Sequence, residues 1–238
     1  AIDDVPLGSA SVAQVHKARL VTGETVAVKV QRPHVKEIMA QDISIMRSLA
    51  KRSAIVMGDE QVLDLQSVVD ELWQSFREET DFLVEARSLE EFRRNNAECK
   101  FIDCPKPYPR LCTEHVVVMD YVEGIPIDKT ERLKAEGYDL SEIGAKLVDN
   151  YTSQMLDDGF FHADPHPGNL VVKGGKIIYL DLGIMGRLSA HDRAAMTDMV
   201  NAVALRDSVG LKNGLLRFSV ADTSDVDHPG LLADLDSI

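Results

Sequence analysis

The hydrophobic pattern divides the chain into a strand-forming part followed by mostly helical segments. Strands are expected over 12–20 and 25–30, joined by a turn at 22–24, because β-branched residues recur on both sides of that turn. Residues 34–57 instead repeat their apolar positions about once per helical turn. A second helical period covers 61–95 without an obvious break, so a single long helix is predicted there.

The second half of the chain is expected to return to strands once and then become helical. A proline-rich connector at 104–109 precedes a strand over 116–121. The later elements expected, in chain order, are a helix over 141–157 that Gly159 ends, a hairpin pairing 169–172 with 176–180, a helix beginning at Ser189, and a helix over 208–218. No element is predicted for the acidic tail from Ala221.

This order of elements is typical of a two-lobed kinase. The pattern predicts an α+β, protein-kinase-like fold in one domain, with a small β-rich N-lobe and a mainly helical C-lobe. Residues 1–122 are assigned to the N-lobe, including a long helical insert, and residues 123–238 to the C-lobe.

Composition narrows the possible partners. A net charge of -13 argues against a nucleic-acid binder, although a lysine and a metal ion can still make a local phosphate site. The three cysteines match no zinc or redox spacing, which favours reduced thiols. Without a signal peptide or a membrane-spanning run, the chain is expected in the cytoplasm or at the inner face of a membrane. Because it begins at Ala1, we expect a piece of a longer protein.

The strongest chemical signal is a loop at 162–169 followed by a second acidic position. Asp164 is expected to orient or deprotonate the hydroxyl group that attacks the phosphate. Asn169 and Asp181 supply oxygen ligands of the kind that hold Mg²⁺ between nucleotide phosphates. His162 and His166 are four residues apart, but prolines in the loop favour a bracing role for them over a helical metal pair.

A lysine in the second strand supplies the next component. Lys29 alternates with valines, so it is placed on the opposite face of the strand, where it is expected to hold the α- and β-phosphates of ATP. Such a lysine needs a carboxylate partner. Glu85 is the preferred candidate and Glu79 the second, because apolar residues between these acids place some of them beside a buried stripe.

Two further segments are predicted to contact the nucleotide. The small residues near the N-terminus allow the backbone to approach phosphate, and the edge of adenine is expected to bond to backbone at the end of the strand over 117–122. The residues assigned to these contacts are Gly8, Ser9, Ala10 and Ser11 for phosphate, and Asp120, Tyr121 and Val122 for adenine.

With these parts in order, the chain resembles the UbiB family of atypical kinases, the aarF-domain kinases linked to coenzyme Q metabolism. The matching motifs are the segments 9–16, 26–33, 79–82 with 85–86, and 161–169. The resemblance implies ATP and Mg²⁺ binding, ATPase or small-molecule kinase activity in ubiquinone biosynthesis, a quinone-precursor lipid as a possible partner, and peripheral membrane contact. The sequence departs from the family in carrying Leu182 where phenylalanine is common and in a less alanine-rich phosphate loop. The family's Lys-x-Gly-Gln segment is not within residues 1–238.

Two other functions fit the same residues. A small-molecule phosphotransferase of the aminoglycoside or choline kinase type carries a similar loop and a metal-binding aspartate after a hairpin. A pseudokinase scaffold would bind ATP without turnover. The segment 14–16 and the acidic helix favour the UbiB family, and a Lys-x-Gly-Gln segment upstream of Ala1 in the full gene would decide between that family and the first alternative.

Overall fold

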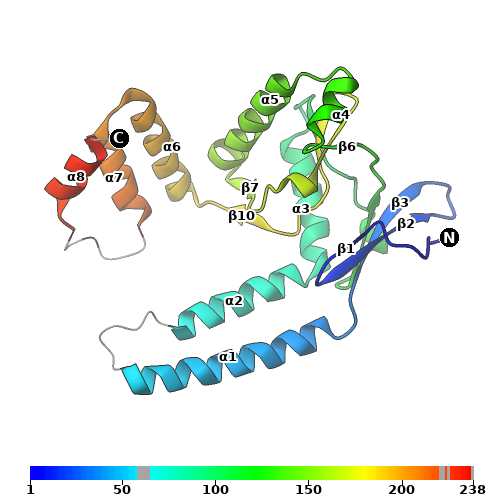
Figure 1. The fold of residues 1–238 in the computed structure, drawn as a ribbon, viewed down its shortest axis with the longest axis horizontal. Helices are drawn as coiled ribbons and strands as arrows, with labels where there is room; N and C mark the ends of the chain where they lie inside the picture. Colours follow the sequence, from blue (N-terminus) through cyan, green and yellow to red (C-terminus); the bar gives the residue numbers. More distant parts are fainter. Residues whose placement is uncertain (58–64, 220–222, 224–225, 237–238) are drawn as a thin grey trace. The chain divides into compact units, whose positions relative to one another are not determined.

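The computed structural model describes residues 1–57, 65–219, 223 and 226–236 (Figure 1). The chain forms two compact units, which we describe separately. The first comprises Ala1–Leu133 and His166–Ile184, and the second comprises Lys134–Pro165 and Met185–Ile238. The first contains two four-stranded sheets and three long helices, and the second is mainly helical, so the predicted α+β class is confirmed.

The N-terminal sheet of the first unit contains the strands predicted from the alternating pattern. Its order is β1 (Gly8–Ser9), β2 (Ala13–Arg19), β3 (Thr25–Gln31) and β5 (Val116–Asp120), with each neighbouring pair antiparallel. Val26 and Val28 pack with Ala18 and Val118 in one hydrophobic cluster. Since successive side chains of a strand point to opposite faces, Lys29 lies on the face away from this cluster.

Three long helices lie in the chain between β3 and β5: α1 (Val35–Met57), α2 (Leu65–Glu79) and α3 (Phe82–Asn95). Figure 1 shows α1 and α2 side by side and antiparallel, and the Arg47 guanidinium lies 2.6 Å from the Asp70 carboxylate between them. The predicted single helix over 61–95 is wrong within its described part, because the chain breaks between α2 and α3. Residues 61–64 lie outside the described residues.

The break has a local cause. The Asp81 backbone is extended, at φ -98° and ψ 93°, and its carboxylate accepts a hydrogen bond from the Leu83 amide as the N-cap of α3. The Thr80 hydroxyl donates to the Phe76 carbonyl at 2.9 Å and to the Arg77 carbonyl at 3.3 Å, so it engages carbonyls of the last turn of α2. Helical periodicity alone does not distinguish such a break from a continuous helix, because both sides keep their apolar stripe.

A second sheet in the first unit carries the predicted hairpin. Its strand order is β4 (Ile102–Asp103), β9 (Lys176–Tyr179), β8 (Leu170–Lys173) and β6 (Ile125–Pro126). The neighbouring parts of the chain form the short helical turns η1 (Pro109–Leu111) and η3 (Pro167–Asn169) and the helix α4 (Thr130–Ala135). Gly174 and Gly175 both have positive φ, at 57° and 79°, as a tight hairpin requires. The rings of Phe92 and Tyr179 meet at 5.0 Å, which packs α3 against this sheet.

The second unit follows the predicted helices with three differences, one of which is an unpredicted pair of short antiparallel strands. Its elements are α5 (Leu140–Ser153), η2 (Gln154–Asp158), β7 (Phe160–His162), β10 (Met185–Arg187), α6 (Ala190–Leu205), α7 (Ser208–Phe218) and α8 (His228–Asp236). The last turn of the helix expected over 141–157 is a π-helix, η2, which Gly159 ends at φ 62° as predicted. The tail contains α8, which was not predicted. No helix among the described residues has the length and apolar character needed to cross a membrane.

Candidate nucleotide site

A pocket of about 460 Å³ in the first unit is lined by the N-terminal sheet, by α3 and by residues that flank the β8–β9 hairpin. This volume is within the range of small-molecule sites. It brings together most of the residues predicted from sequence: Gly8, Ser9, Ala10, Lys29, Glu85, Asp120, Tyr121, Val122, Asn169 and Asp181. Among the residues assigned to phosphate or adenine, Ser11 alone does not line the pocket, and it is exposed. The expected Ser11 contact with phosphate is therefore not supported.

Lys29 lies at the centre of the polar contacts in this pocket. Its ammonium is 2.9 Å from Glu85 Oε2 and 2.8 Å from Asp181 Oδ2, so the ion pair predicted between Lys29 and Glu85 is present. The Glu85 side chain is only 3% exposed, whereas that of Asp181 is 40% exposed. One carboxylate oxygen of Asp181 thus contacts Lys29, and another edge of the side chain remains accessible to solvent. The side chain of Glu79, the second candidate partner, lies outside the described part of the chain.

The charges of this cluster are unbalanced. Burial alone lowers the pKa of Lys29, but Glu85 and Asp181 together raise it well above its ordinary value, so the lysine is charged. One ammonium then faces two carboxylates, and Glu85 Oε1 has no hydrogen-bond partner among the described atoms. A cation at the accessible edge of Asp181 would balance this excess negative charge.

The excess charge leads to a prediction about pH. Burial raises the pKa of Glu85 to about 7; Lys29 opposes the shift and Asp181 adds to it. Because the folded-state pKa exceeds the ordinary value of 4.5, the contribution to stability is fully present below that value and is lost as pH rises towards about 7. We expect Glu85→Gln to remove this part of the pH dependence of the unfolding free energy, measured by urea denaturation. An unchanged slope in Glu85→Gln, with the exposed Glu90→Gln as control, would assign the dependence to other groups.

The β8–β9 hairpin places the two predicted metal ligands beside each other. The Leu180 amide donates to the Asn169 carbonyl at 2.8 Å. Asn169 directly precedes β8 and Leu180 directly precedes Asp181, so this bond holds Asn169 close to Asp181. Asp181 Oδ1 accepts the Gly183 amide at 2.9 Å, which orients the carboxylate. A β-carbon at Gly183 would lie 3.1 Å from that same oxygen. Amide and carboxylate oxygens are suitable donors for Mg²⁺, which takes few protein ligands when phosphates complete its shell.

The strand end at Asp120–Val122 has one free backbone donor. The Asp120 amide donates to the Lys106 carbonyl, and the Tyr121 amide donates to the Thr25 carbonyl. The Asp120 carboxylate accepts the Tyr108 hydroxyl at 2.8 Å. No partner is found for the Val122 amide within the described residues, which leaves it available to the edge of a bound base.

Sequence reasoning missed the apolar walls of the pocket. Ala13, Val15 and Ala27 line it from β2 and β3, and Met119 lines it from β5. Ala27 is two residues from Lys29, so the period of the strand could have placed it on the same face. The register that sets Val15 opposite Lys29 and Ala27 opposite Met119 could not be read from one sequence.

Asp164 belongs to the second unit, on a loop held by a buried polar network. His162 is 2% exposed, and its Nδ1 accepts the Asp164 amide at 3.1 Å. The Tyr151 hydroxyl donates to the His162 carbonyl at 2.9 Å. His166, in the first unit, accepts the Gly168 amide through Nδ1 at 2.8 Å. The bracing role predicted for both histidines is therefore observed.

The buried Gln154 supports this loop and was not predicted. Its side-chain oxygen accepts the His162 amide at 3.0 Å, and its side-chain nitrogen donates to Asn150 Oδ1 at 2.7 Å. Gln154 is fully buried and opens the π-helix η2. Because π-helical turns are rare and are often found at functional sites, the interruption of α5 has a structural purpose here: it turns Gln154 towards the loop that carries Asp164.

We expect Gln154→Leu to be destabilising. The change leaves the buried His162 amide and the Asn150 side chain without their partner, which costs about 2 kcal/mol or more. Chemical denaturation of the wild-type protein and of Gln154→Leu measures this difference in unfolding free energy. Gln154→Glu keeps the acceptor for the His162 amide but buries a carboxylate against Asn150 Oδ1, so we expect it to be destabilising as well. Equal stability of wild type and Gln154→Leu would show that the network contributes little.

Comparison with known proteins agrees with this geometry. Residues 1–215 match the model of the ABC1 atypical kinase-like domain. A probable protein kinase UbiB of Pseudomonas putida is 36% identical over 210 residues, which cover 86% of this chain and 39% of that protein. The chloroplastic protein ACTIVITY OF BC1 COMPLEX KINASE 8 of Arabidopsis thaliana is 34% identical over 223 residues, covering 92% of this chain and 29% of that protein. An uncharacterised Clostridium pasteurianum protein is 41% identical over 221 residues, or 89% of this chain and 42% of its own.

The chain therefore belongs to the ABC1 atypical kinase-like family, which confirms the resemblance to UbiB and the kinase-like fold. A solved structure supports the fold. The complex of Rv3197 with erythromycin, from Mycobacterium tuberculosis, superposes with a TM-score of 0.67 at 23% identity and covers 90% of this chain and 54% of that one. The chain spans less than half the length of the curated relatives described above.

Proposed function

We propose that the protein binds ATP with Mg²⁺ and transfers or hydrolyses its terminal phosphate, as an atypical kinase or ATPase of the UbiB type. The observation that carries this proposal is the contact of Lys29 with both Glu85 and Asp181 inside a pocket of suitable size. A lysine on a strand, paired with a helix glutamate, is the arrangement that positions nucleotide phosphates in kinases.

Each group has a distinct role in this proposal. Lys29 contacts the α- and β-phosphates, and the Val122 amide donates to adenine. Asp181 and Asn169 would hold Mg²⁺, which when bound would neutralise charge on the phosphates. Asp164 accepts a proton from the attacking hydroxyl or water. Catalysis then depends mainly on positioning and on electrostatic stabilisation, without a covalent enzyme intermediate.

Lys29 contacts Asp181 Oδ2, and the exposed edge of Asp181 is where a metal ion would bind. Bound Mg·ATP would give each group a new partner: phosphate oxygens for Lys29 and the metal for Asp181. Binding then exchanges one ion pair for two charge-assisted contacts. Free ATP without the metal would bring further negative charge to a cluster that already has an excess of it, so the metal should be needed for tight binding.

Ubiquinone biosynthesis is the process in which we place this activity, with a quinone-precursor lipid as the acceptor or ligand and a membrane surface nearby. The support is the family and the UbiB relatives. If the acceptor is a different small molecule, the protein would instead be a small-molecule phosphotransferase. If it binds ATP without turnover, it would be a pseudokinase scaffold. The intact Asp164, Asn169 and Asp181 set favours turnover over the scaffold.

Turnover is tested by measuring phosphate release from Mg·ATP, alone and with phenolic quinone precursors or anionic liposomes. Mg²⁺-dependent release, or transfer to the phenol, supports the proposal. Tight Mg·ATP binding with no release or transfer under every condition would favour the scaffold. Transfer to an aminoglycoside or choline instead would favour the small-molecule phosphotransferase.

We expect Lys29→Ala to weaken Mg·ATP binding by about tenfold or more while the protein stays folded. The change leaves Glu85 buried without its cation, but the raised pKa of Glu85 lets it take up a proton near neutral pH. Calorimetric titration and a thermal melt measure the two properties, with the exposed Lys100→Ala as control. Loss of the fold together with binding would mean that Lys29 has a mainly structural role.

A further inference from the structure

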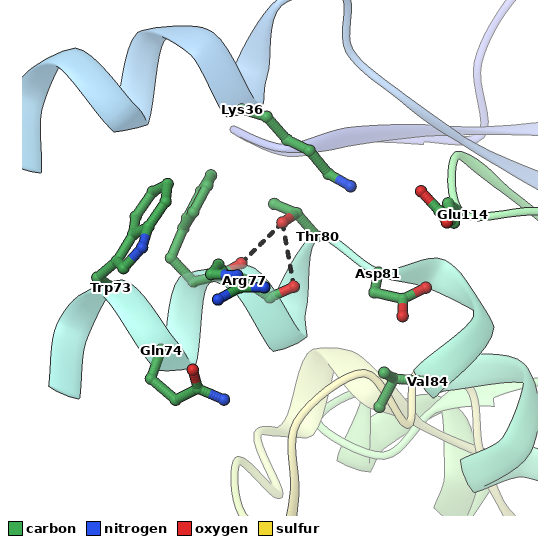
Figure 2. Close-up of a pocket in the computed structure, with 9 residues that line it drawn as sticks. Lys36, Trp73, Gln74, Arg77, Thr80, Asp81, Val84 and Glu114 are labelled. Carbon is green, nitrogen blue, oxygen red and sulfur yellow. Dashed lines mark hydrogen bonds between the residues drawn. The ribbon is translucent and has the colours of Figure 1, made fainter. Parts of the chain in front are cut away.

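A second pocket, of about 440 Å³, lies where α2 meets α3 (Figure 2). Its lining comes from the start of α1, the end of α2, the start of α3 and the loop before β5. All of these segments belong to the first unit. None of the pocket's residues lines the candidate nucleotide site, so this is a separate cavity.

One wall of this pocket is aromatic. The Trp73 and Phe76 rings stack, with centroids 6.0 Å apart and an interplanar angle of 16°. Phe76 is buried, whereas Trp73 is half-buried and lines the cavity. Val84 adds an apolar side chain from α3. A flat apolar group placed here would cover a tryptophan that the fold leaves partly open to water.

The pocket also has two cations available for a ligand. Lys36 and Arg77 line it, and neither has an ion pair among the described side chains. Figure 2 shows the Lys36 side chain extending into the space between Trp73 and Glu114. Of the two acids in the lining, Asp81 already accepts the Leu83 amide and lies 3.9 Å from Arg87, while Glu114 is exposed. The lining thus holds as many acids as cations, but Asp81 already has partners, and Lys36 and Arg77 are the groups available to an anion.

The same pocket contacts the segment that positions Glu85. Asp81 caps α3 and Val84 is the residue before Glu85. Gln31, two residues after Lys29 on β3, donates from its side chain to the Thr80 carbonyl at 3.1 Å. A ligand held against Thr80, Asp81 and Val84 thus touches both the start of α3 and its link to β3. Placement of this helix decides whether the lysine–glutamate pair of a kinase-like site forms.

We propose that this pocket binds an organic anion with an aromatic body, of the aromatic carboxylate class, and that its occupancy changes the affinity of the nucleotide site through Glu85. The ring packs on Trp73, and the carboxylate accepts hydrogen bonds from Lys36 and Arg77. The coupling part rests on the proposed function, whereas the binding part does not.

Trp73 makes the binding part directly measurable, because it is the single tryptophan of the sequence. The probe is 3-phenylpropionate, and 3-phenylpropionamide is its neutral match. With excitation at the red edge of the tryptophan band, the carboxylate should change the Trp73 fluorescence in a saturable manner below about 10 mM. The amide should bind about tenfold more weakly, as should Arg77→Gln and Lys36→Gln. Arg94→Gln, an exposed change on α3 outside the pocket, should leave the titration unchanged.

Any of three results would overturn the assignment of an anion site. These are no saturable change with 3-phenylpropionate, equal binding of the acid and the amide, and no effect of either charge variant. Coupling is then tested by titrating Mg·ATP with and without saturating 3-phenylpropionate, where a shift of about fivefold is expected. Saturable binding with an unchanged ATP affinity would overturn the coupling. If ATP does not bind at all, the proposed function fails and the fluorescence titration alone decides the site.

Discussion

Asp181→Asn should abolish Mg²⁺-dependent nucleotide binding. The single oxygen of the side-chain amide can accept either the Lys29 ammonium or the Gly183 amide, so one of the two contacts now made by separate carboxylate oxygens is lost. Because the Asp181 side chain is 40% exposed, the folded state should persist despite this loss. The negative charge that attracts the metal is lost, so the affinity for Mg·ATP should fall by about a hundredfold, and the difference between titrations with and without Mg²⁺ should disappear.

The matched control for this variant is Asp128→Asn, an exposed aspartate of the same unit whose carboxylate contacts Lys129. This change alters the net charge equally and should leave nucleotide binding unchanged. Calorimetric titration of ATP into both variants makes the comparison. Undiminished Mg·ATP binding by Asp181→Asn would remove the metal assignment, and with it the explanation for the excess negative charge around Lys29.

Asp164→Asn should have the opposite profile, with binding preserved and turnover lost. Asp164 is exposed, and no hydrogen bond to its carboxylate is found among the described residues, so the loop does not depend on that group. If Asp164 takes the proton of the attacking group, its loss should lower turnover by about a thousandfold. Asp157→Asn, an exposed neighbour in the same unit, serves as control. Phosphate release at saturating Mg·ATP measures the effect, and full activity of Asp164→Asn would assign proton transfer to another group.

The positions of the charged site residues could be predicted from sequence because their signals are local. Alternation along β3 placed Lys29 on the face opposite Val26 and Val28, and the two-glycine turn fixed the hairpin that precedes Asp181. The choice of Glu85 as the partner of Lys29 also succeeded, since its neighbours Phe82 and Ala86 are buried.

Other features depend on contacts that periodicity does not contain. The break at Asp81 came from side-chain capping, which competes with continuation of a helix whose apolar stripe is unbroken. The role of Gln154 depends on a π-helical turn that rotates one polar side chain into the interior. Strand register, which brings Val15 and Met119 to the pocket walls, is set by pairing between distant segments. The aromatic pocket beside α3 arises for the same reason, since its lining comes from four separate segments.

The central claim is that the Lys29–Glu85–Asp181 cluster forms a nucleotide site that a metal ion completes. Calorimetric titration of the wild-type protein with ATP, in the presence and absence of Mg²⁺, tests it most directly. We predict saturable binding with Mg²⁺ and binding at least about tenfold weaker without it, because ATP alone adds negative charge to the cluster. Equal affinity in the two titrations, or no binding in either, would contradict the claim.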